Sequence, residues 1–441
     1  MTLQKRVSAL GAGAALLWTS VAQAQGPVDL VGPPAGPSES ALECLSIDQA
    51  MSLSAARDPN ARIAEAERAS ADADLREARS LFRPQISAFT RAGFGDVGLV
   101  DSTLQNQVGL RASQRVFDFG DARFAKRAAR FAQEASGYAT AQARLDAAQG
   151  TGSAVLEALE MSERITVSQE RALYFERQLA SIDALLSEGG ATRTERANAA
   201  SRLAEANAIL LELEFQRERA SQRVLIDTGL ATQVCSNEKQ LDFLLQSVAV
   251  FPDDASAISS ALAQNPTARV IENEIKSQEA LVSRQKAGAF PVISVVGISA
   301  FSSTGALGDL TQQNRVGVDV SIPLYSGNAA SAQVDRARAQ RAASAGRLAV
   351  HQRDLQLQVS VSFRRIGSLR KLREQRREVA RQSLLRFEAA EAQFGFRAIT
   401  LPDLIDARIE FEEAKAQTIS TEYDFWREHL ELLALTGQLP S

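Results

Sequence analysis

Histidine and cysteine are scarce in this sequence. Its 441 residues include two histidines, His351 and His429, and two cysteines, Cys44 and Cys235, and no metal-type spacing surrounds either cysteine. Zinc sites and Cys/His catalytic sites need several of these side chains close together. We therefore expect no metal, no cofactor and no enzymatic activity.

The sequence also lacks long apolar runs, apart from a short one at its beginning. Lys5 and Arg6 precede an alanine-rich apolar stretch, residues 9–21, and "AQA" at 22–24 offers small residues for cleavage. This pattern predicts a secretory signal peptide at 1–24, because the apolar run is shorter than the ~20 residues of a spanning helix. The residue directly after the cleavage point is Gln25 and not cysteine, so we do not expect a lipid anchor.

Two further features limit the partners. Beyond the signal peptide no apolar segment reaches spanning length, so a membrane-inserted form of this chain would have to use a β-barrel. The net charge is −4, which together with export argues against nucleic acid as a partner. We expect the basic stretch 370–381 to be the solvated face of a helix.

The two cysteines allow two interpretations. After export, Cys44 and Cys235 would lie in an oxidising compartment, where structural disulfides are common. Two unpaired, partly buried thiols fit the sequence equally well.

Proline is missing from two long stretches. None occurs between Pro84 and Pro252, or between Pro323 and Pro402. These stretches predict helices at about 120–188 and 328–394, each on the order of 100 Å long at ~1.5 Å per residue. Apolar residues recur there, and in a returning helix, at the steps of three and four that are typical of coiled coils. The positions are Phe124, Ala128, Phe131, Ala135, Tyr138, Phe175, Leu179, Ile182, Leu186, Leu404, Ala407, Phe411 and Ala414.

The chain is internally duplicated. "RDPNARI" around Pro59 returns as "QNPTARV" around Pro266, and Gly120 returns as Gly327, each 207 residues later. Further along, "DTG" returns as "LTG" at an offset of 208. Such steady offsets over most of the mature chain indicate duplication rather than chance.

Each half predicts the same order of elements: a short helix, a helix opened by proline, two strands, a very long helix and a long returning helix. The predicted segments are a signal peptide (1–24), a Pro/Gly-rich segment (25–44), a first repeat (45–229), a linker (230–254), a second repeat (255–437) and a tail (438–441).

Four strands are predicted, at about 85–98, 104–117, 291–302 and 312–324. The clearest is "NRVGVDVSI", in which one face is purely apolar. Lengths of 10–13 residues with this alternation fit outer-membrane barrel strands, and a soluble sheet packed on one face is the alternative. Four strands cannot close a barrel, so the chain is expected to oligomerise. Two copies would supply eight strands and three would supply twelve.

Several paired motifs resemble the TolC-like outer-membrane efflux proteins. These are the strand-to-helix joints "RVFDFGDA" and "PLYSGNAA", the tip segments "EGGATRTERANA" and "FRAITLPDLIDA", and the closing "DTG" and "LTG". The resemblance implies a mixed α and β fold: a homotrimer with a twelve-stranded barrel in the outer membrane of a Gram-negative bacterium, continued by an α-helical tunnel in the periplasm. The implied partners are outer-membrane lipid, a periplasmic adaptor protein and an inner-membrane ABC or RND transporter.

The resemblance also implies a gate at the periplasmic helix tips. Its acids would be Glu195, Asp403 and Asp406; for Glu195, stabilisation of the helix dipole is an equally good interpretation. Phe394 takes the place of the family's gate aromatic. Ile399 occupies the usual basic place, and Arg397 lies two residues earlier. The other positions implied are tip turns at Gly189, Gly190 and Gly395, barrel-to-tunnel joints at Gly120 and Gly327, and cysteines near the middle of the tunnel.

The function expected from these features is an exit duct of a tripartite export system. Type I protein secretion is slightly favoured over drug efflux, because many dedicated drug-pump ducts carry a lipid anchor. A secreted structural or adhesive coiled-coil protein is the alternative, and it would explain the helices but not the strands.

Overall fold

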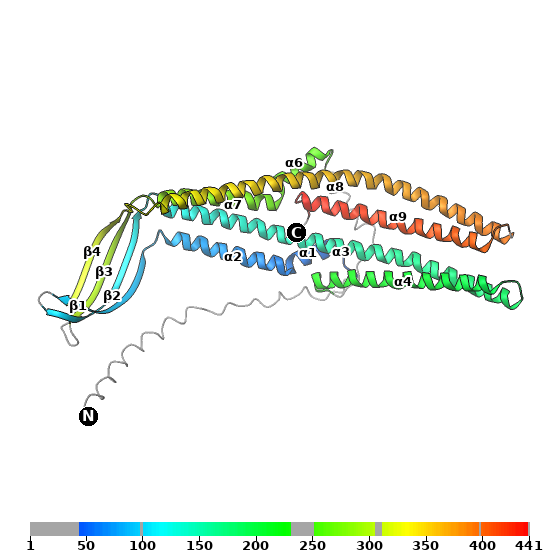
Figure 1. The fold of residues 1–441 in the computed structure, drawn as a ribbon, viewed down its shortest axis with the longest axis horizontal. Coiled ribbons are helices and arrows are strands. Elements are labelled where there is room, and N and C mark those ends of the chain that lie inside the picture. Colours follow the sequence, from blue (N-terminus) through cyan, green and yellow to red (C-terminus); the bar gives the residue numbers. More distant parts are fainter. Residues whose placement is uncertain (1–43, 98–99, 231–250, 305–310, 397, 440–441) are drawn as a thin grey trace, which may run out of the picture. The chain divides into compact units, whose positions relative to one another are not determined.

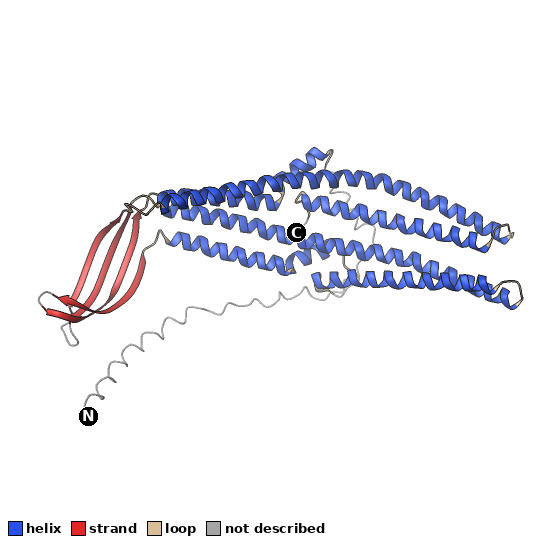
Figure 2. Ribbon diagram, viewed as in Figure 1, coloured by secondary structure: helices blue, strands red, loops and turns tan. Residues whose placement is uncertain are grey.

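The computed structural model describes residues 44–97, 100–230, 251–304, 311–396 and 398–439 (Figure 1). The predicted signal peptide, the Pro/Gly-rich segment up to residue 43 and most of the predicted linker lie outside the described residues. Within the unit that begins at Cys44, the helices extend away from a single sheet (Figure 2).

The two repeats contain matching elements. The first has α1 (Ile47–Arg57), α2 (Pro59–Ser80), β1 (Gln85–Val97), β2 (Val100–Phe117), α3 (Asp121–Ser187) and α4 (Arg193–Thr228). The second has α6 (Asp254–Gln264), α7 (Pro266–Ala287), β3 (Val292–Thr304), β4 (Thr311–Ser321), α8 (Ala329–Gly395) and α9 (Leu401–Leu435). Both α3 and α8 contain 67 residues.

The change of offset between the repeats falls at one place. The elements from α1 to β1 match those from α6 to β3 at an offset of 207, whereas α3 and α4 match α8 and α9 at 208. The extra residue therefore lies in the second repeat between β3 and the start of α8.

The prolines and polar caps begin the helices as the sequence predicts. Pro59, Pro266 and Pro402 each lie in a first helical turn, where a missing N–H costs no hydrogen bond. The Asp58 side chain caps α2, and the Asn265 side chain accepts from the Ala268 N–H at 3.1 Å to cap α7.

The helices form a row whose two ends are free within the chain. α2, α3, α7 and α8 contact one another in that order along the first half of α3, and α4, α3, α9 and α8 do so along its second half. α3 is thus a central helix. Among the described helices, α8 makes no extensive contact with α2 or α4.

Polar contacts fix the helices of this row along their length. The Ser277 hydroxyl of α7 donates to the Ala128 carbonyl of α3 at 3.0 Å, and Arg427 of α9 pairs with Glu160 of α3 at 2.7 Å. Alanines such as Ala128 and Ala135 are buried in α3, which permits the close approach of its neighbours. Tyr138, predicted at the same seam, is 42% exposed, because the buried stripe of α3 passes through Ala135 and Thr140 instead.

The largest core lies where α1, α3, α6, α8 and α9 meet. It includes Leu45, Met51, Leu156, Phe425 and Leu430, each 1% exposed or less. The short helices α1 and α6 therefore pack against the row of long helices and complete this core. Cys44 precedes Leu45 of this core.

The four strands form one antiparallel sheet in the order β1-β2-β3-β4. Val318 lies opposite Val295, and Leu110 lies opposite Ser299 on the same face. That face is solvent-accessible within one chain: Val316 is 81% exposed and Val318 is 68% exposed. β1 and β4 each have a free edge.

Strand β4 ends earlier than the predicted 324. It stops at Ser321, because Pro323 has no N–H to donate to a neighbouring strand. No helix among the described residues is both long enough and apolar enough to cross a membrane.

Candidate functional site

The candidate gate consists of the two helix tips at the ends of α3 and α8. In the first repeat, Gly189 has φ 76°, a left-handed conformation that favours glycine, and Gly190 follows with an ordinary backbone. In the second repeat, Gly395 is the last residue of α8 and has no left-handed conformation. The two tips therefore turn differently, although both lead to a threonine-capped helix.

Glu195 takes part in the cap of α4. Its carboxylate accepts the Thr192 N–H at 2.7 Å and the Thr192 hydroxyl at 2.9 Å, and the Glu195 N–H donates to that hydroxyl at 3.2 Å. These bonds to Thr192 hold the pKa of Glu195 below its ordinary value. Glu195 is thus part of the helix cap, and its roles in a gate and in stabilising the helix dipole both stay predictions.

Asp403 makes the same arrangement in the second repeat. Its carboxylate accepts the Thr400 hydroxyl at 2.5 Å and the Thr400 N–H at 2.9 Å. The hydroxyl bond is the largest cause that holds the pKa of Asp403 below its ordinary value. Asp403 is thus an exposed, charged residue that also caps its own helix.

Asp406 differs from the two capping acids. It is exposed, one turn further along α9, and it makes no hydrogen bond or ion pair with the described residues. Its carboxylate is therefore available to the space around the tip. Among the three predicted acids, Asp406 is the one that the helix cap does not use.

Phe394, the aromatic residue predicted at the gate, packs against other residues of its own chain. Phe394 is partly buried against a cluster formed by Phe387, Leu404 and Ala407, and Ile399 contacts the same cluster. Ile399, in the place of a basic residue, therefore helps to fix the turn by apolar contact. Arg397 lies outside the described residues.

A buried charge cluster near the tip was not predicted from the sequence. Glu412 of α9 is 3% exposed, and its carboxylate lies 2.6 Å from Arg408 Nε of α9 and 3.5 Å from Arg171 Nε of α3. Burial raises the pKa of Glu412, and the two guanidinium groups partly offset this. The spacing of Arg408 and Glu412 is visible in the sequence, but their burial is not.

Aromatic rings surround the Arg408 guanidinium. Its central carbon lies 4.8 Å from the ring centroid of Tyr174 in α3 and 5.0 Å from that of Phe387 in α8. Cation–π contacts and the ion pairs thus connect three helices behind the tip. We call Arg171, Arg408 and Glu412 the tip-side ion cluster.

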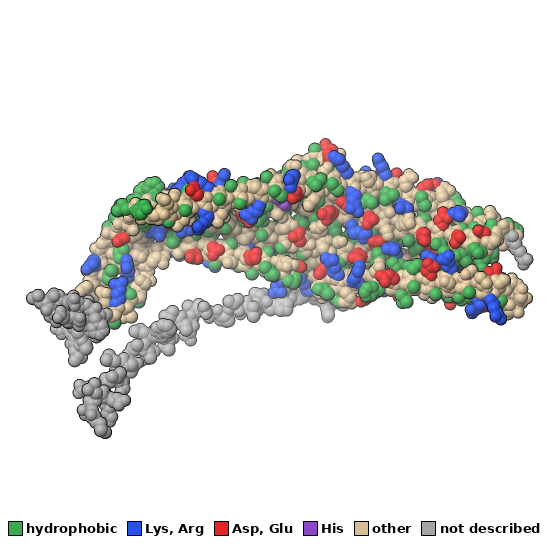
Figure 3. All heavy atoms as spheres, viewed as in Figure 1, with side chains coloured by type: hydrophobic (Ala, Val, Ile, Leu, Met, Phe, Trp, Pro, Cys, Tyr) green, Lys and Arg blue, Asp and Glu red, His purple; other side chains and the backbone are tan. Residues whose placement is uncertain are grey.

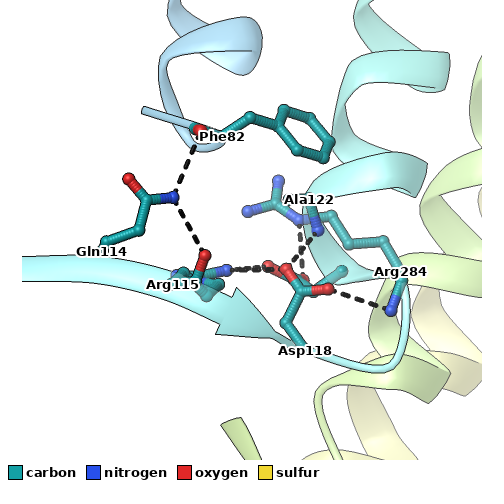
Figure 4. A network of polar contacts seen from close by, with 8 residues as sticks. Phe82, Gln114, Arg115, Asp118, Ala122 and Arg284 are labelled. Carbon is teal, nitrogen blue, oxygen red and sulfur yellow. Dashed lines mark hydrogen bonds and ion pairs between the residues drawn. The ribbon is translucent and has the colours of Figure 1, made fainter. Parts of the chain in front are cut away.

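The first strand-to-helix joint is held by a polar network (Figure 4). Asp118 accepts the Gly120 and Ala122 N–H groups at 3.0 and 2.9 Å. Arg115 pairs with Asp121 at 2.8 Å, and Arg284 of α7 reaches the same carboxylate at 3.2 Å. Gly120 has φ 95°, which its lack of a Cβ permits.

The second joint is built differently. The residue that precedes α8 in a left-handed conformation is Asn328, with φ 65°, so Asn328 rather than Gly327 matches Gly120 as the helix cap. Gly327 matches Phe119, since both have positive φ. Leu324 and Tyr325 are 91% and 88% exposed, and Figure 3 shows apolar side chains gathered where the strands meet the helices.

The structure describes one of the two cysteines. Cys44 is disulfide-bonded. Cys235 lies outside the described residues, so the pairing of Cys44 with Cys235 stays a prediction.

Comparison with known families matches both repeats. Residues 50–226 and 257–438 match the family described as outer membrane efflux protein. The chain belongs to the outer membrane efflux protein family. A curated relative, the outer membrane efflux protein BepC of Brucella suis biovar 1 (strain 1330), is 23% identical over 375 residues, which cover 83% of this chain and 80% of BepC.

Solved structures of channels share the fold. CusC matches with a TM-score of 0.79 and 15% identity over 89% of this chain and 92% of its own. The Campylobacter jejuni outer membrane channel CmeC matches with 0.77 and 16% identity over 89% and 86%. The Neisseria gonorrhoeae outer membrane channel MtrE matches with 0.74 and 17% identity over 89% of each chain.

These matches confirm the predicted family and fold class. Each chain of this outer membrane efflux protein contributes mainly helices and one four-stranded antiparallel sheet. The family and fold are those of non-enzymatic channels in the outer membrane with a helical tunnel in the periplasm. Nothing in the comparisons supports a secreted coiled-coil protein.

Proposed function

We propose that three copies of this chain form the outer-membrane exit duct of a tripartite export system. The observation that carries the proposal is that the sheet and the helix row are open on the same two sides. β1, α2 and α4 are at one side of the chain, and β4 and α8 are at the other. Unpaired strand edges are not stable in lipid, so a neighbouring chain must cover them.

The free helix edges carry apolar side chains. On α8, Leu357, Val361 and Leu385 are more than half exposed, and on α4 so are Leu211 and Phe215. α4 and α8 are the two ends of the helix row along the tip half of the molecule. A second copy placed edge to edge would bury both stripes.

The joints support the same arrangement. Leu324 and Tyr325 lie beside the free edge of the second joint, and on the opposite edge Phe82 is 50% exposed. Contact between neighbouring copies would cover these side chains as well. Three copies give a twelve-stranded closed sheet, in keeping with the likeness to TolC-like channels, which are homotrimers.

We further propose that Asp406 from three chains forms an acidic ring at the narrow end of the tunnel. Its exposed carboxylate has no hydrogen-bond or ion-pair partner among the described residues, which supports this role, because a ring of carboxylates attracts cations. Asp403 and Glu195 would contribute charge from their helix caps, while Phe394 fixes the turn beside them. Arg397 is the candidate for a basic partner in the closed state.

The proposed partners are a periplasmic adaptor and an inner-membrane transporter of the ABC or RND type. The sequence favours type I secretion of protein, whereas the relative BepC is an outer membrane efflux protein. A deletion strain distinguishes them. Loss of secreted protein with unchanged drug sensitivity supports type I secretion, and increased drug sensitivity with normal secretion supports efflux.

The trimer is tested by charges placed on the free edge of α8. We expect the wild-type chain to migrate as a heat-modifiable trimer in outer-membrane fractions, and Leu357→Asp with Val361→Asp to abolish it. The control is Thr166→Asp with Gln169→Asp, because these exposed residues lie on the central helix α3. A trimer that survives the α8 changes would contradict the proposed interface.

A further inference from the structure

One face of the sheet carries Arg115, which is paired with Asp118 and Asp121, and three further arginines. Arg91 is on β1, Arg111 on β2 and Arg315 on β4, and all three are exposed. The pairing register places them on the same face: Arg91 lies opposite Gln107, while Arg111 and Arg315 lie on either side of Ile298. This is the face opposite to that of Leu110, Val316 and Val318, since side chains alternate along a strand. We call it the arginine face.

The arginines line one shared concave surface. Its other lining residues are Phe89, Gln107, Ile298 and Gln313, which place two amide side chains among the guanidinium groups. Arg91 lies 5.2 Å from the centroid of the Phe89 ring, so an aromatic face supports its position. Figure 3 shows Lys and Arg side chains over the strands on the visible side.

The positive charge of this surface is not neutralised within the described part of the chain. None of the three arginines makes an ion pair with a described residue. Asp319 lies on the same face, four residues along β4 from Arg315, or about 13 Å at ~3.3 Å per residue. Among the side chains that the structure describes, the three guanidinium groups thus have one distant carboxylate on their face, and the surface is net positive.

We propose that the arginine face lines the lumen of the closed sheet and forms an anion-attracting section of the channel. The proposal rests on the trimer, because closing the sheet with the apolar face toward lipid turns the arginine face inward. Three chains then place nine guanidinium groups around one lumen. The ligands are small anions and the carboxylate or phosphate groups of cargo, which guanidinium binds in a bidentate geometry.

The two ends of the duct would then differ in charge. The tip carries the exposed acids Asp403 and Asp406, and the sheet carries Arg91, Arg111 and Arg315. A charged, water-filled section raises the local concentration of oppositely charged ions. The arginine face therefore opposes the cation preference of the tip, and the selectivity of the whole channel depends on both.

The test is the reversal potential of purified trimers in planar bilayers under a KCl gradient at low ionic strength. We expect Arg91→Gln, Arg111→Gln and Arg315→Gln together to lower the chloride-to-potassium permeability ratio ~3-fold or more, because local ion concentration follows the lumen charge. Replacement of the same three residues by lysine should preserve the ratio. The control is Arg62→Gln, Arg68→Gln and Arg217→Gln, which removes from α2 and α4 three exposed arginines that form no ion pair with a described residue.

An unchanged permeability ratio in the triple glutamine variant would overturn the proposed role of the arginine face, but it would not contradict the proposed channel. An equal fall in the control would do the same, because it would show an effect of overall charge. Should the triple variant fail to form trimers, the three single glutamine variants replace it, and an unchanged ratio in all three overturns the proposal. Absence of channels from the wild-type chain would instead contradict the proposed function.

Discussion

Acidic residues at the helix tips have two different roles at the residue scale. Glu195 and Asp403 occupy the same place in the two repeats, three residues after a capping threonine, and bind that threonine. Asp406 has no such contact. Within a single turn of α9, Asp403 is therefore part of the helix cap and Asp406 is not.

Asp406→Ala tests this separation. We expect the variant to form normal trimers of unchanged thermal stability, and to show a cation-to-anion permeability ratio lowered ~2-fold or more, because a ring of carboxylates at a constriction attracts cations. Asp403→Ala should instead lower thermal stability slightly through loss of its contacts with Thr400. Single-channel conductance and cation preference identical to wild type in Asp406→Ala would contradict the gate assignment.

His429 gives the protein a pH-dependent stability. It is 1% exposed in the main core, and burial lowers its pKa to about 4 from an ordinary value of 6.5. Because the folded pKa is lowered, its contribution is fully present above pH ~6.5 and is lost as the pH falls toward 4.

We expect the wild-type chain to lose about 2 kcal/mol per chain more than His429→Gln between pH 7 and 4.5. Denaturation in detergent, followed by circular dichroism at both pH values, measures this difference. The comparison with the variant cancels the opposite effect of buried acids such as Glu431, whose pKa burial raises. Parallel pH profiles of the two proteins would show that His429 does not titrate in this range.

The tip-side ion cluster acts at the scale of elements. Arg408 and Glu412 belong to α9 and Arg171 to α3, so the cluster fixes the returning helix of the second repeat against the long helix of the first. Its position behind the tip means that movement of α9 against α3 would have to break it.

Glu412→Ala should therefore be strongly destabilising, by about 3 kcal/mol per chain, because it leaves two guanidinium groups without their buried carboxylate. Glu410→Ala is the matched control on the same helix. Glu410 forms an exposed pair with Arg386, and its loss should cost less than ~1 kcal/mol. Thermal melts of both variants measure the difference. Equal losses of stability would mean that the tip-side ion cluster does not stabilise the packing of α9 against α3.

The elements themselves were predictable to the extent that local chemistry specifies them. Proline positions and the alternation of "NRVGVDVSI" mark helix starts and strands, because both depend on neighbouring residues. The equivalence of Gly120 with Asn328 was not predictable from matching glycines, since asparagine also adopts the left-handed conformation. Nor was the tip-side ion cluster, because burial of Glu412 depends on contacts between α3 and α9.

At the scale of the whole molecule, the free edges explain why so much apolar surface is exposed. Val316 and Val318 face outward from the sheet, whereas Leu357 and Val361 lie on the unpaired edge of α8. In the proposed duct, lipid covers the first group and a neighbouring chain covers the second. A single chain covers neither group, which is why the account predicts an assembly.

The most direct measurement is electron cryomicroscopy of the full-length chain purified from outer membranes. We predict threefold particles in which β4 of each chain pairs with β1 of the next, giving twelve strands in one closed sheet, and in which α8 packs against α2 and α4 of its neighbour. A twofold particle with eight strands, or a monomer with β1 and β4 unpaired, would contradict the proposed duct.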